Sequence, residues 1–171
     1  MRNLTTPDIE EFLLESNAIE GVFDDDSYEQ ALIAWNWLSE QREMSAHVML
    51  KTHKILMLHQ NLYPNEKGYF RNVPVWIGGR EGIDSSKIAP AIKHLCMNIN
   101  DIIDNGKKES EIFLNKITKE HHVEYEKIHP FVDGNGRTGR MFMNWERLKV
   151  GLPLLIIHAG DEQQEYYKWF I

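Results

Sequence analysis

Residues 129–140 read HPFVDGNGRTGR, and this stretch decides how the rest of the chain is interpreted. It contains one histidine, one aspartate, one asparagine, two arginines and three glycines. A loop needs glycine to turn, but it does not need an imidazole, a carboxylate and two guanidinium groups close together. The mixture therefore indicates a binding or catalytic site that a glycine-rich loop helps to form.

Two known glycine-rich motifs explain this stretch poorly. Gly134, Gly136 and Gly139 have the spacing of the dinucleotide-binding fingerprint, and an acidic residue, Asp161, follows at a suitable distance. That fingerprint must follow a buried strand, whereas the preceding EYEKIHPFVD is helical, charged and broken by proline. A Walker loop would need lysine and then serine or threonine after Gly139, where this chain has arginine and methionine. Both motifs are therefore disfavoured.

The polar residues of the stretch favour a phosphate site instead. The turn from Gly134 to Gly136 can point its backbone N–H groups at one anion, and a helix that begins there adds its positive end. Arg137 and Arg140 are three residues apart, so they project from one face of that helix and could clamp two successive phosphates. The sequence thus predicts a site for a polyphosphate.

Asp133 and His129 add catalytic groups to this site. A carboxylate beside phosphates usually binds Mg²⁺, which is the role that we expect for Asp133. His129 can accept a proton from an attacking hydroxyl, because the ordinary pKa of an imidazole is about 6.5. Phe131, between them, is expected to anchor the loop in the core. This set of groups is suited to attack on a polyphosphate.

The stretch resembles the signature of the Fic family, H-P-F-x-[DE]-G-N-G-R-x-x-R, and every specified position matches. The resemblance extends to GYFRNVPVWIGG at residues 68–79, which is similar to the family's flap hairpin, and to the helix that ends in EYEKIHPF. It implies a mainly α fold, a Fic-type helical domain with one small β-hairpin flap. We expect residues 1–171 to form a single domain of this kind.

The resemblance implies that AMP is transferred from ATP, with Mg²⁺, to a Ser, Thr or Tyr hydroxyl of a target protein. His129 would be the general base, and Asp133 would bind Mg²⁺ at the α- and β-phosphates. The remaining nucleotide contacts would come from Gly134, Asn135, Gly136, Arg137, Arg140 and, at the adenine, Tyr167. The target would dock on the flap, at Arg71, Asn72, Val73, Pro74, Val75 and Trp76.

A second stretch, SNAIEG at residues 16–21, resembles the family's inhibitory helix, [ST]-x-x-x-E-[GN]. The expected inhibitory residues are Ser16, Glu20 and Gly21, at the end of a helix over 6–21. A salt bridge from Glu20 to Arg140 would remove the partner of the γ-phosphate. The resemblance therefore implies a self-inhibited enzyme.

The direction of the reaction stays open at the level of the sequence. In some relatives of this architecture the inhibitory glutamate positions a water that removes AMP from a target, and Glu20 could act in this way. A nucleotide-binding regulatory module without catalysis is a further alternative, although binding alone does not need the imidazole of His129. Auto-modification and homo-oligomer formation also stay open.

Periodicity predicts helices along most of the chain. A capping box of Ser27 with Gln30 is expected to begin the second helix. The remaining helices are expected over about 45–59, from Ile88 onward, over 111–128, from the glycine loop to about 150, and over about 162–170. The aromatic and β-branched residues of 68–79, bounded by glycines, predict the hairpin.

The composition excludes several classes of protein. The net charge of −7, from 19 basic and 26 acidic side chains, argues against a general nucleic-acid binder. No apolar run is long enough to be a signal peptide or to span a membrane, and a single cysteine fits a reducing compartment, so we expect a cytoplasmic protein. His121 and His122 lack the spacing of a zinc-protease motif and are expected on a helix face or in the core.

Overall fold

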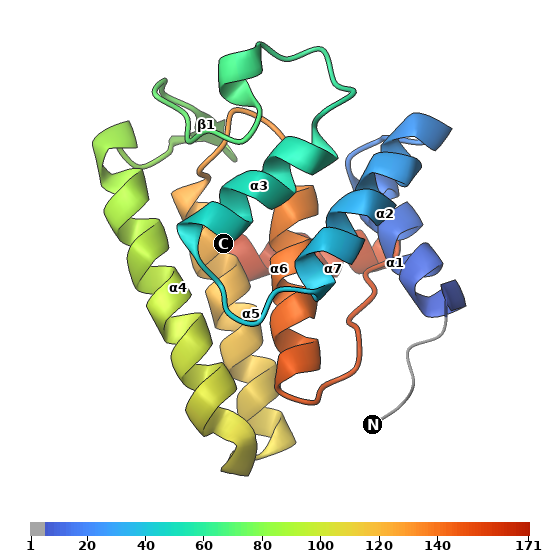
Figure 1. The fold of residues 1–171 in the computed structure, drawn as a ribbon, viewed down its shortest axis with the longest axis vertical. Helices are drawn as coiled ribbons and strands as arrows, with labels where there is room; N and C mark the ends of the chain where they lie inside the picture. Colours follow the sequence, from blue (N-terminus) through green and yellow to red (C-terminus); the bar gives the residue numbers. More distant parts are fainter. Residues whose placement is uncertain (1–5) are drawn as a thin grey trace.

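The computed structural model describes residues 6–171, apart from the side chains of Arg80 and Lys107, and it is mainly helical (Figure 1). Its helices are α1 (Thr6–Ile19), α2 (Asp25–Ser39), α3 (Ala46–Leu56), α4 (Ile88–Asn105), α5 (Glu111–Ile128), α6 (Asn135–Lys149) and α7 (Asp161–Tyr167). Short 3₁₀ turns lie between and after them. The expected mainly α fold with one small hairpin is confirmed, while residues 1–5 of the expected single domain lie outside the described part.

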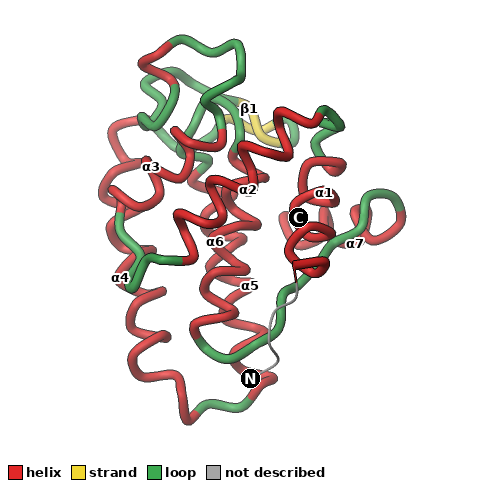
Figure 2. Tube along the Cα trace, turned by 45° about the vertical axis from the view of Figure 1, so that its right-hand side comes forward, coloured by secondary structure: helices red, strands yellow, loops and turns green. Residues whose placement is uncertain are grey.

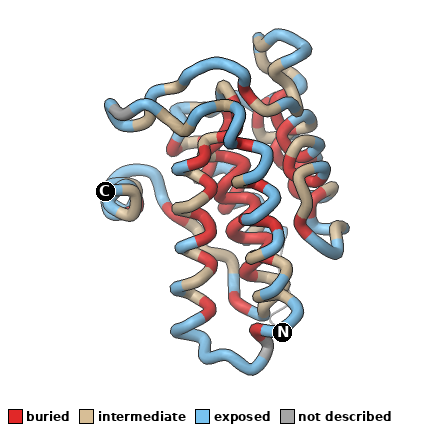
Figure 3. Tube along the Cα trace, turned by 90° about the vertical axis from the view of Figure 1, so that its left-hand side faces the viewer, coloured by how far each residue is buried: buried red, intermediate tan, exposed pale blue. Residues whose placement is uncertain are grey.

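Helix α6 is the centre of the fold. It contacts α1, α2, α3, α4 and α5, and it runs through the middle of the bundle beside α5 (Figures 1 and 2). Most of its residues are buried, including charged ones, because neighbouring helices cover it on several sides. Figure 3 shows the buried segments gathered along these inner helices. The polar residues that follow the glycine loop are therefore held inside the protein, where unpaired charges are unfavourable.

The second helix begins differently from the expectation. Asp24 is its N-cap, and the Asp24 carboxylate accepts a hydrogen bond from the backbone N–H of Ser27 at 2.8 Å. Ser27 is fully buried and its hydroxyl lies 2.7 Å from Nε2 of His59, at the end of the following helical segment. The predicted capping box of Ser27 with Gln30 is wrong, because Ser27 is already inside the helix.

The hairpin lies at a later position than expected. Strands β1 (Trp76–Ile77) and β2 (Arg80–Glu81) are antiparallel, with Trp76 opposite Glu81, and they lie at one end of the bundle (Figure 2). Gly78 and Gly79 form the turn with φ of 55° and 81°, as a two-residue hairpin loop requires. The bounds 68–79 were wrong because these glycines are the turn and not the end of the hairpin. Residues 68–75 are irregular backbone.

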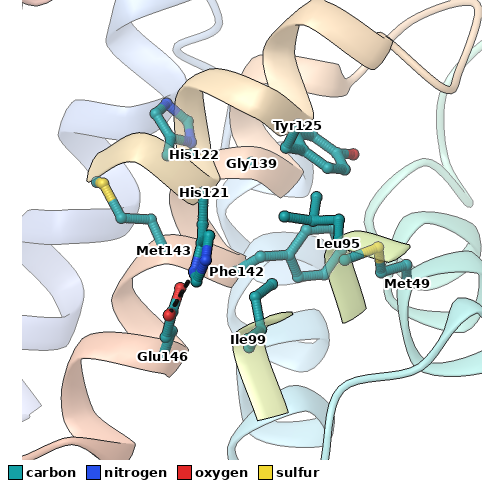
Figure 4. Close-up of a pocket in the computed structure, with 10 residues that line it drawn as sticks. All are labelled: Met49, Leu95, Ile99, His121, His122, Tyr125, Gly139, Phe142, Met143 and Glu146. Atoms are coloured by element: carbon teal, nitrogen blue, oxygen red, sulfur yellow. Dashed lines mark hydrogen bonds and ion pairs between the residues drawn. The ribbon is translucent and has the colours of Figure 1, made fainter. Parts of the chain in front are cut away.

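A small cavity lies between α3, α4, α5 and α6 (Figure 4). His121 and His122 both line it and are buried, as we expected for core residues, and Nδ1 of His121 is 2.7 Å from Oε1 of Glu146. The cavity volume of about 10 Å³ is room for about one water. This cavity is a packing gap and is too small for a nucleotide. Within residues 6–171, no helix combines the length and apolar character needed to cross a bilayer.

Candidate active site

The HPFVDGNGRTGR loop connects the end of α5 to the start of α6. His129 ends α5 in a left-handed conformation with φ of 48°, and Gly134 precedes α6 in the same region with φ of 77°. The first N–H groups of an α-helix have no partner inside the helix, and they carry its positive end. The loop therefore presents the start of α6 as a place for an anion.

Asn135 and His53 hold this loop in shape. Asn135 donates to the backbone carbonyl of Phe131 and accepts from its N–H, both at 2.9 Å, and Asn135 is buried. Phe131 is fully buried, as predicted for the loop anchor, and its ring stacks on His53 at a centroid distance of 3.7 Å. Because the Asn135 amide is bonded to Phe131 through both its oxygen and its nitrogen, its side chain supports the loop, and its expected contact with the nucleotide stays a prediction.

His53 connects three parts of the site. Its Nδ1 accepts from the N–H of Gly68 at 2.9 Å, so Nε2 carries the proton that is donated to the backbone carbonyl of Asp133 at 3.0 Å. Burial lowers the pKa of His53 to about 4, which keeps the imidazole neutral. His53 belongs to α3, and sequence reasoning missed it because its partners follow 15 and 80 positions later.

His129 is partly exposed at the mouth of the loop. Its Nδ1 contacts the backbone carbonyl of Glu126 at 3.3 Å, and its side chain is 24% exposed. Desolvation lowers the pKa of His129. A neutral imidazole that has Nδ1–H bonded to a carbonyl leaves Nε2 free to accept a proton.

Asp133 faces the solvent. Its side chain is 58% exposed, its Oδ1 accepts from the N–H of Gly134 at 2.6 Å, and its Oδ2 is 4.0 Å from Nη2 of Arg137. No group of three potential metal ligands of the His, Cys, Asp or Glu type occurs in the described part of the chain. Mg²⁺ can nevertheless bind to a protein through a single carboxylate when phosphate oxygens and waters supply its other ligands. Asp133 fits that role.

Arg137 is a buried cation with unused donors. It is 3% exposed, and its Nε and Nη1 are buried without a hydrogen-bond partner among the described residues. Its Nη2 contacts only weak or distant groups, the sulfur of Met57 at 3.4 Å and the Asp133 carboxylate. Burial lowers the pKa of Arg137. A guanidinium in this position can donate hydrogen bonds to an anion through these two nitrogens.

Arg140 is also buried, but its donors are occupied. Its Nη2 donates to Oε1 of Glu20 at 2.7 Å and to the carbonyl of Ser16 at 2.8 Å, and its Nε donates to the Ser16 hydroxyl at 2.9 Å. Its Nη1 is 3.3 Å from the hydroxyl of Tyr166. The contact that the sequence predicted between Glu20 and Arg140 is present.

The end of α1 fixes the position of Glu20. The N–H of Val22 donates to the carbonyl of Asn17, and the N–H of Gly21 donates to that of Ala18, both at 3.0 Å. These two bonds form a Schellman motif, which requires the left-handed conformation of Gly21, with φ of 70°. The Glu20 carboxylate then lies against the start of α6, so close that a Cβ on Gly136 would collide with it.

The flap residues divide into two groups. Arg71 is buried, and its guanidinium donates to the backbone carbonyls of His129, Val73 and Ile83 at 2.7, 2.9 and 2.8 Å. It therefore connects the flap to the end of α5, and its expected role in target docking stays a prediction. The expected docking residues that stay exposed or half-exposed are Asn72, Val73, Pro74, Val75 and Trp76.

The tyrosine that contacts the site is Tyr166. Tyr166 is buried and its hydroxyl lies 2.8 Å from Nε2 of His122 as well as beside Arg140. Tyr167, which we expected at the adenine, is 41% exposed, and its hydroxyl accepts from Gln163 at 2.8 Å. Tyr166 gave no signal in the sequence, because its two partners come from distant helices.

A sequence profile of the Fic/DOC family matches residues 49–146. Protein adenylyltransferase Fic of Drosophila grimshawi is 28% identical over 130 residues, which are 76% of this chain and 26% of that protein. Protein adenylyltransferase fic-1 of Caenorhabditis elegans is 28% identical over 130 residues, covering 75% and 24%. The chain thus spans about a quarter of the length of these curated relatives.

Solved structures share the fold. A Fic domain containing signaling protein from Bacteroides thetaiotaomicron superposes with a TM-score of 0.76 at 17% identity, covering 94% of this chain and 70% of that one. Fic-1 of Caenorhabditis elegans superposes with a TM-score of 0.73 at 19% identity, covering 98% and 56%. The helical bundle around α6 is therefore a known architecture.

Proposed function

Because the chain belongs to the Fic/DOC family, we propose that it transfers AMP from ATP to a Ser, Thr or Tyr hydroxyl of a target protein. We further propose that Glu20 restrains this transfer. The names of the relatives, protein adenylyltransferases, support the reaction type. The positions of the loop residues support a mechanism for AMP transfer by this chain.

The observation that carries the proposal is the unused guanidinium of Arg137. Its Nε and Nη1 are buried near the start of α6 without a hydrogen-bond partner among residues 6–171, so both N–H groups can donate to an anion. Forked hydrogen bonds from arginine and the positive end of a helix are the usual protein groups that bind phosphates. Arg137 would bind the α- and β-phosphates of ATP beside the N–H groups of Asn135 and Gly136.

His129 would act as the general base. Its neutral imidazole would accept the proton of the target hydroxyl at Nε2 while the hydroxyl oxygen attacks the α-phosphorus. The bond to the bridging oxygen then breaks, and pyrophosphate leaves. The exposed residues of the flap, such as Asn72 and Trp76, would hold the target segment beside His129, and Tyr167 would lie near the adenine.

Asp133 would hold Mg²⁺ at the mouth of the loop. When bound, Mg²⁺ would supply positive charge that offsets the negative charge on the phosphates. The protein's own contribution is to keep one hard carboxylate exposed there. Since Oδ1 of Asp133 accepts from Gly134, the carboxylate is oriented before the nucleotide arrives.

Glu20 would inhibit by occupying Arg140. That guanidinium would otherwise bind the γ-phosphate, and the Glu20 carboxylate would also repel an anion at the start of α6. ATP would then bind weakly or in a non-productive pose. Release of the end of α1 would free Arg140 and permit transfer.

Labelled ATP tests the reaction. The full chain and its Glu20→Gly variant are incubated with Mg²⁺ and ATP labelled at the α-phosphate, alone and with a cell lysate. Covalent label on protein, confirmed as an AMP adduct by mass spectrometry, supports adenylyl transfer and excludes a module that only binds nucleotide. Bound but non-covalent label in both proteins would contradict the proposal.

A further inference from the structure

Glu126 is a buried carboxylate that the mechanism above does not use. It lies in the last turn of α5, and its side chain is 12% exposed. Its Oε1 is buried and has no hydrogen-bond partner among the described residues. A buried carboxylate oxygen without a partner is destabilising, so its presence beside the site needs a reason.

Glu126 contacts His129 through two groups. Nδ1 of His129 lies 3.3 Å from the backbone oxygen of Glu126 and 3.8 Å from its Oε2. The carbonyl contact is longer than the usual N–H···O distance of about 2.9–3.0 Å. The carbonyl alone therefore holds the imidazole loosely, and the Oε2 atom of the carboxylate lies near the same nitrogen, at ion-pair distance.

The backbone at His129 favours this pairing. Among residues 6–171, His129 is the one non-glycine residue with a positive φ. Such a conformation is unfavourable for a residue that has a Cβ atom, and it persists where the surrounding structure enforces it. Here the His129 carbonyl is fixed by Arg71 at 2.7 Å, and the ring stays beside the residue three positions earlier.

The charges around the Glu126 carboxyl come from three directions. His129 follows three residues later at the end of α5, Arg140 belongs to α6, and Glu20 follows α1. Gly139 of α6 makes room for the carboxyl, since a Cβ there would collide with Oε1. Burial raises the pKa of Glu126 to about 7, Arg140 opposes this shift and Glu20 adds to it. A positive imidazole at 3.8 Å would favour the ionised carboxylate.

We propose that Glu126 is a positioning residue for His129, and that its carboxylate, with Oε2 3.8 Å from Nδ1 of the ring, stabilises the imidazolium during transfer. This inference rests on the proposed function. In the step, the target O–H bond breaks and its proton goes to Nε2 of His129, while the hydroxyl oxygen bonds to the α-phosphorus. The α-phosphorus bond to the bridging oxygen breaks, and pyrophosphate leaves with the electron pair. The positive ring is then paired with the carboxylate until Nε2 returns its proton to water.

Nitrogen NMR of the imidazoles tests the pair without requiring transfer. Glu126→Gln keeps the shape of the side chain and removes its charge. We expect the pKa of His129 to fall by about one pH unit and the share of the Nδ1–H tautomer to decrease. Glu124→Gln is a matched control, because its carboxylate is also 3.8 Å from a histidine, His94, but is 40% exposed. An unchanged pKa and tautomer of His129 in Glu126→Gln would overturn the inference.

Kinetics in the Glu20→Gly background give the second measurement. Glu126→Gln should lower kcat about tenfold with an unchanged KM for ATP, and Glu126→Asp, which keeps the charge, should lose less. A kcat equal to that of the parent, or an equal loss in Glu124→Gln, would contradict the positioning role. If Glu20→Gly transfers no AMP at all, the proposed function fails, and the NMR comparison still decides whether Glu126 controls His129.

Discussion

Nη2 of Arg140 donates a hydrogen bond to Oε1 of Glu20 at 2.7 Å, across 120 positions of the sequence. Arg140 is 2% exposed, whereas the Glu20 side chain is 37% exposed. The same guanidinium also donates to Ser16 through two nitrogens. Loss of Glu20 therefore removes one partner of a buried cation while α1 keeps its remaining contacts. Because Glu20 is partly exposed and Arg140 keeps its other partners, the Glu20–Arg140 contact can break without unfolding the protein.

Replacement of His129 by alanine should abolish transfer and leave ATP binding largely intact. A general base acts in the transition state, whereas Arg137 and the start of α6 would hold the bound nucleotide. The rate of AMP incorporation and the ATP affinity from calorimetry check this. Near-normal transfer in His129→Ala would remove the base from the mechanism.

Asp133→Ala should weaken activity and its dependence on Mg²⁺ together. Asp133 is the carboxylate proposed to hold the metal, and its exposed side chain makes no contact that the fold requires beyond the N–H of Gly134. Titration of activity against Mg²⁺ measures the effect. Glu66→Ala is the control, because the half-buried Glu66 also accepts a hydrogen bond from a backbone N–H, that of Tyr63 at 2.9 Å, but belongs to a different part of the chain. An unchanged metal dependence in Asp133→Ala would assign the metal to another residue.

The main elements could be predicted from the sequence because their signals are local. Helix α5 has the bounds 111–128 that its periodicity and Pro130 indicated. Helix α1 ends at Ile19, two residues before the expected bound, because Glu20 and Gly21 form the turn that closes it. The start of α2 was misplaced, because Asp24 and Ser27 are both good N-cap residues and the choice depends on His59, a distant partner of Ser27. Local patterns do not contain such contacts.

The candidate site could be predicted in part. The loop residues and Glu20 belong to short motifs, so chemical roles could be proposed for them from the sequence alone. The structural contacts of Arg71, His53 and Tyr166 could not be predicted, because each has a partner that the fold brings to it over 44 to 80 positions. Burial also matters for the interpretation of Arg137. Its Nε and Nη1, which have no hydrogen-bond partner among the described residues, would be ordinary on the surface and are informative because they are buried.

Tyr166→Phe should destabilise the fold by about 1–3 kcal/mol. The change leaves Nη1 of Arg140 and Nε2 of His122 without the hydroxyl that they share. Chemical denaturation of the full chain measures the free energy of unfolding. Tyr167→Phe, the neighbouring and exposed tyrosine, should have a much smaller effect. Equal effects of the two changes would show that the Tyr166 hydroxyl is not a structural partner.

Acid should destabilise the protein through His122. Burial lowers the pKa of His122 to about 3, whereas an unfolded chain has a histidine pKa near 6.5. Above pH 6.5 both states are neutral, and the fold has its full stability from this group. As the pH falls from 6.5 toward 3, the unfolded state takes up a proton and the folded state does not, so stability is lost, on the order of 3 kcal/mol by pH 4.

Denaturation at pH 7 and pH 4 checks this expectation. His122→Phe should show a smaller loss of stability between the two pH values than the unchanged chain. His94→Phe, at an exposed histidine, should behave like the unchanged chain. A pH dependence that is the same in all three proteins would exclude His122 as a source of acid sensitivity.

The most direct test of the account is AMP incorporation by four proteins: the unchanged chain, Glu20→Gly, the double variant Glu20→Gly with Arg140→Ala, and the control Glu40→Gly. Glu40 is a matched residue, because it is exposed and follows α2 as Glu20 follows α1. Thermal unfolding first confirms that all four are folded. Since a charge-assisted pair contributes about 1.5–3 kcal/mol, Glu20→Gly should raise incorporation at least ~10-fold. The control should equal the unchanged chain, and the double variant should lose the gain. An inactive Glu20→Gly, or a double variant that stays fully activated, would contradict self-inhibition through Arg140.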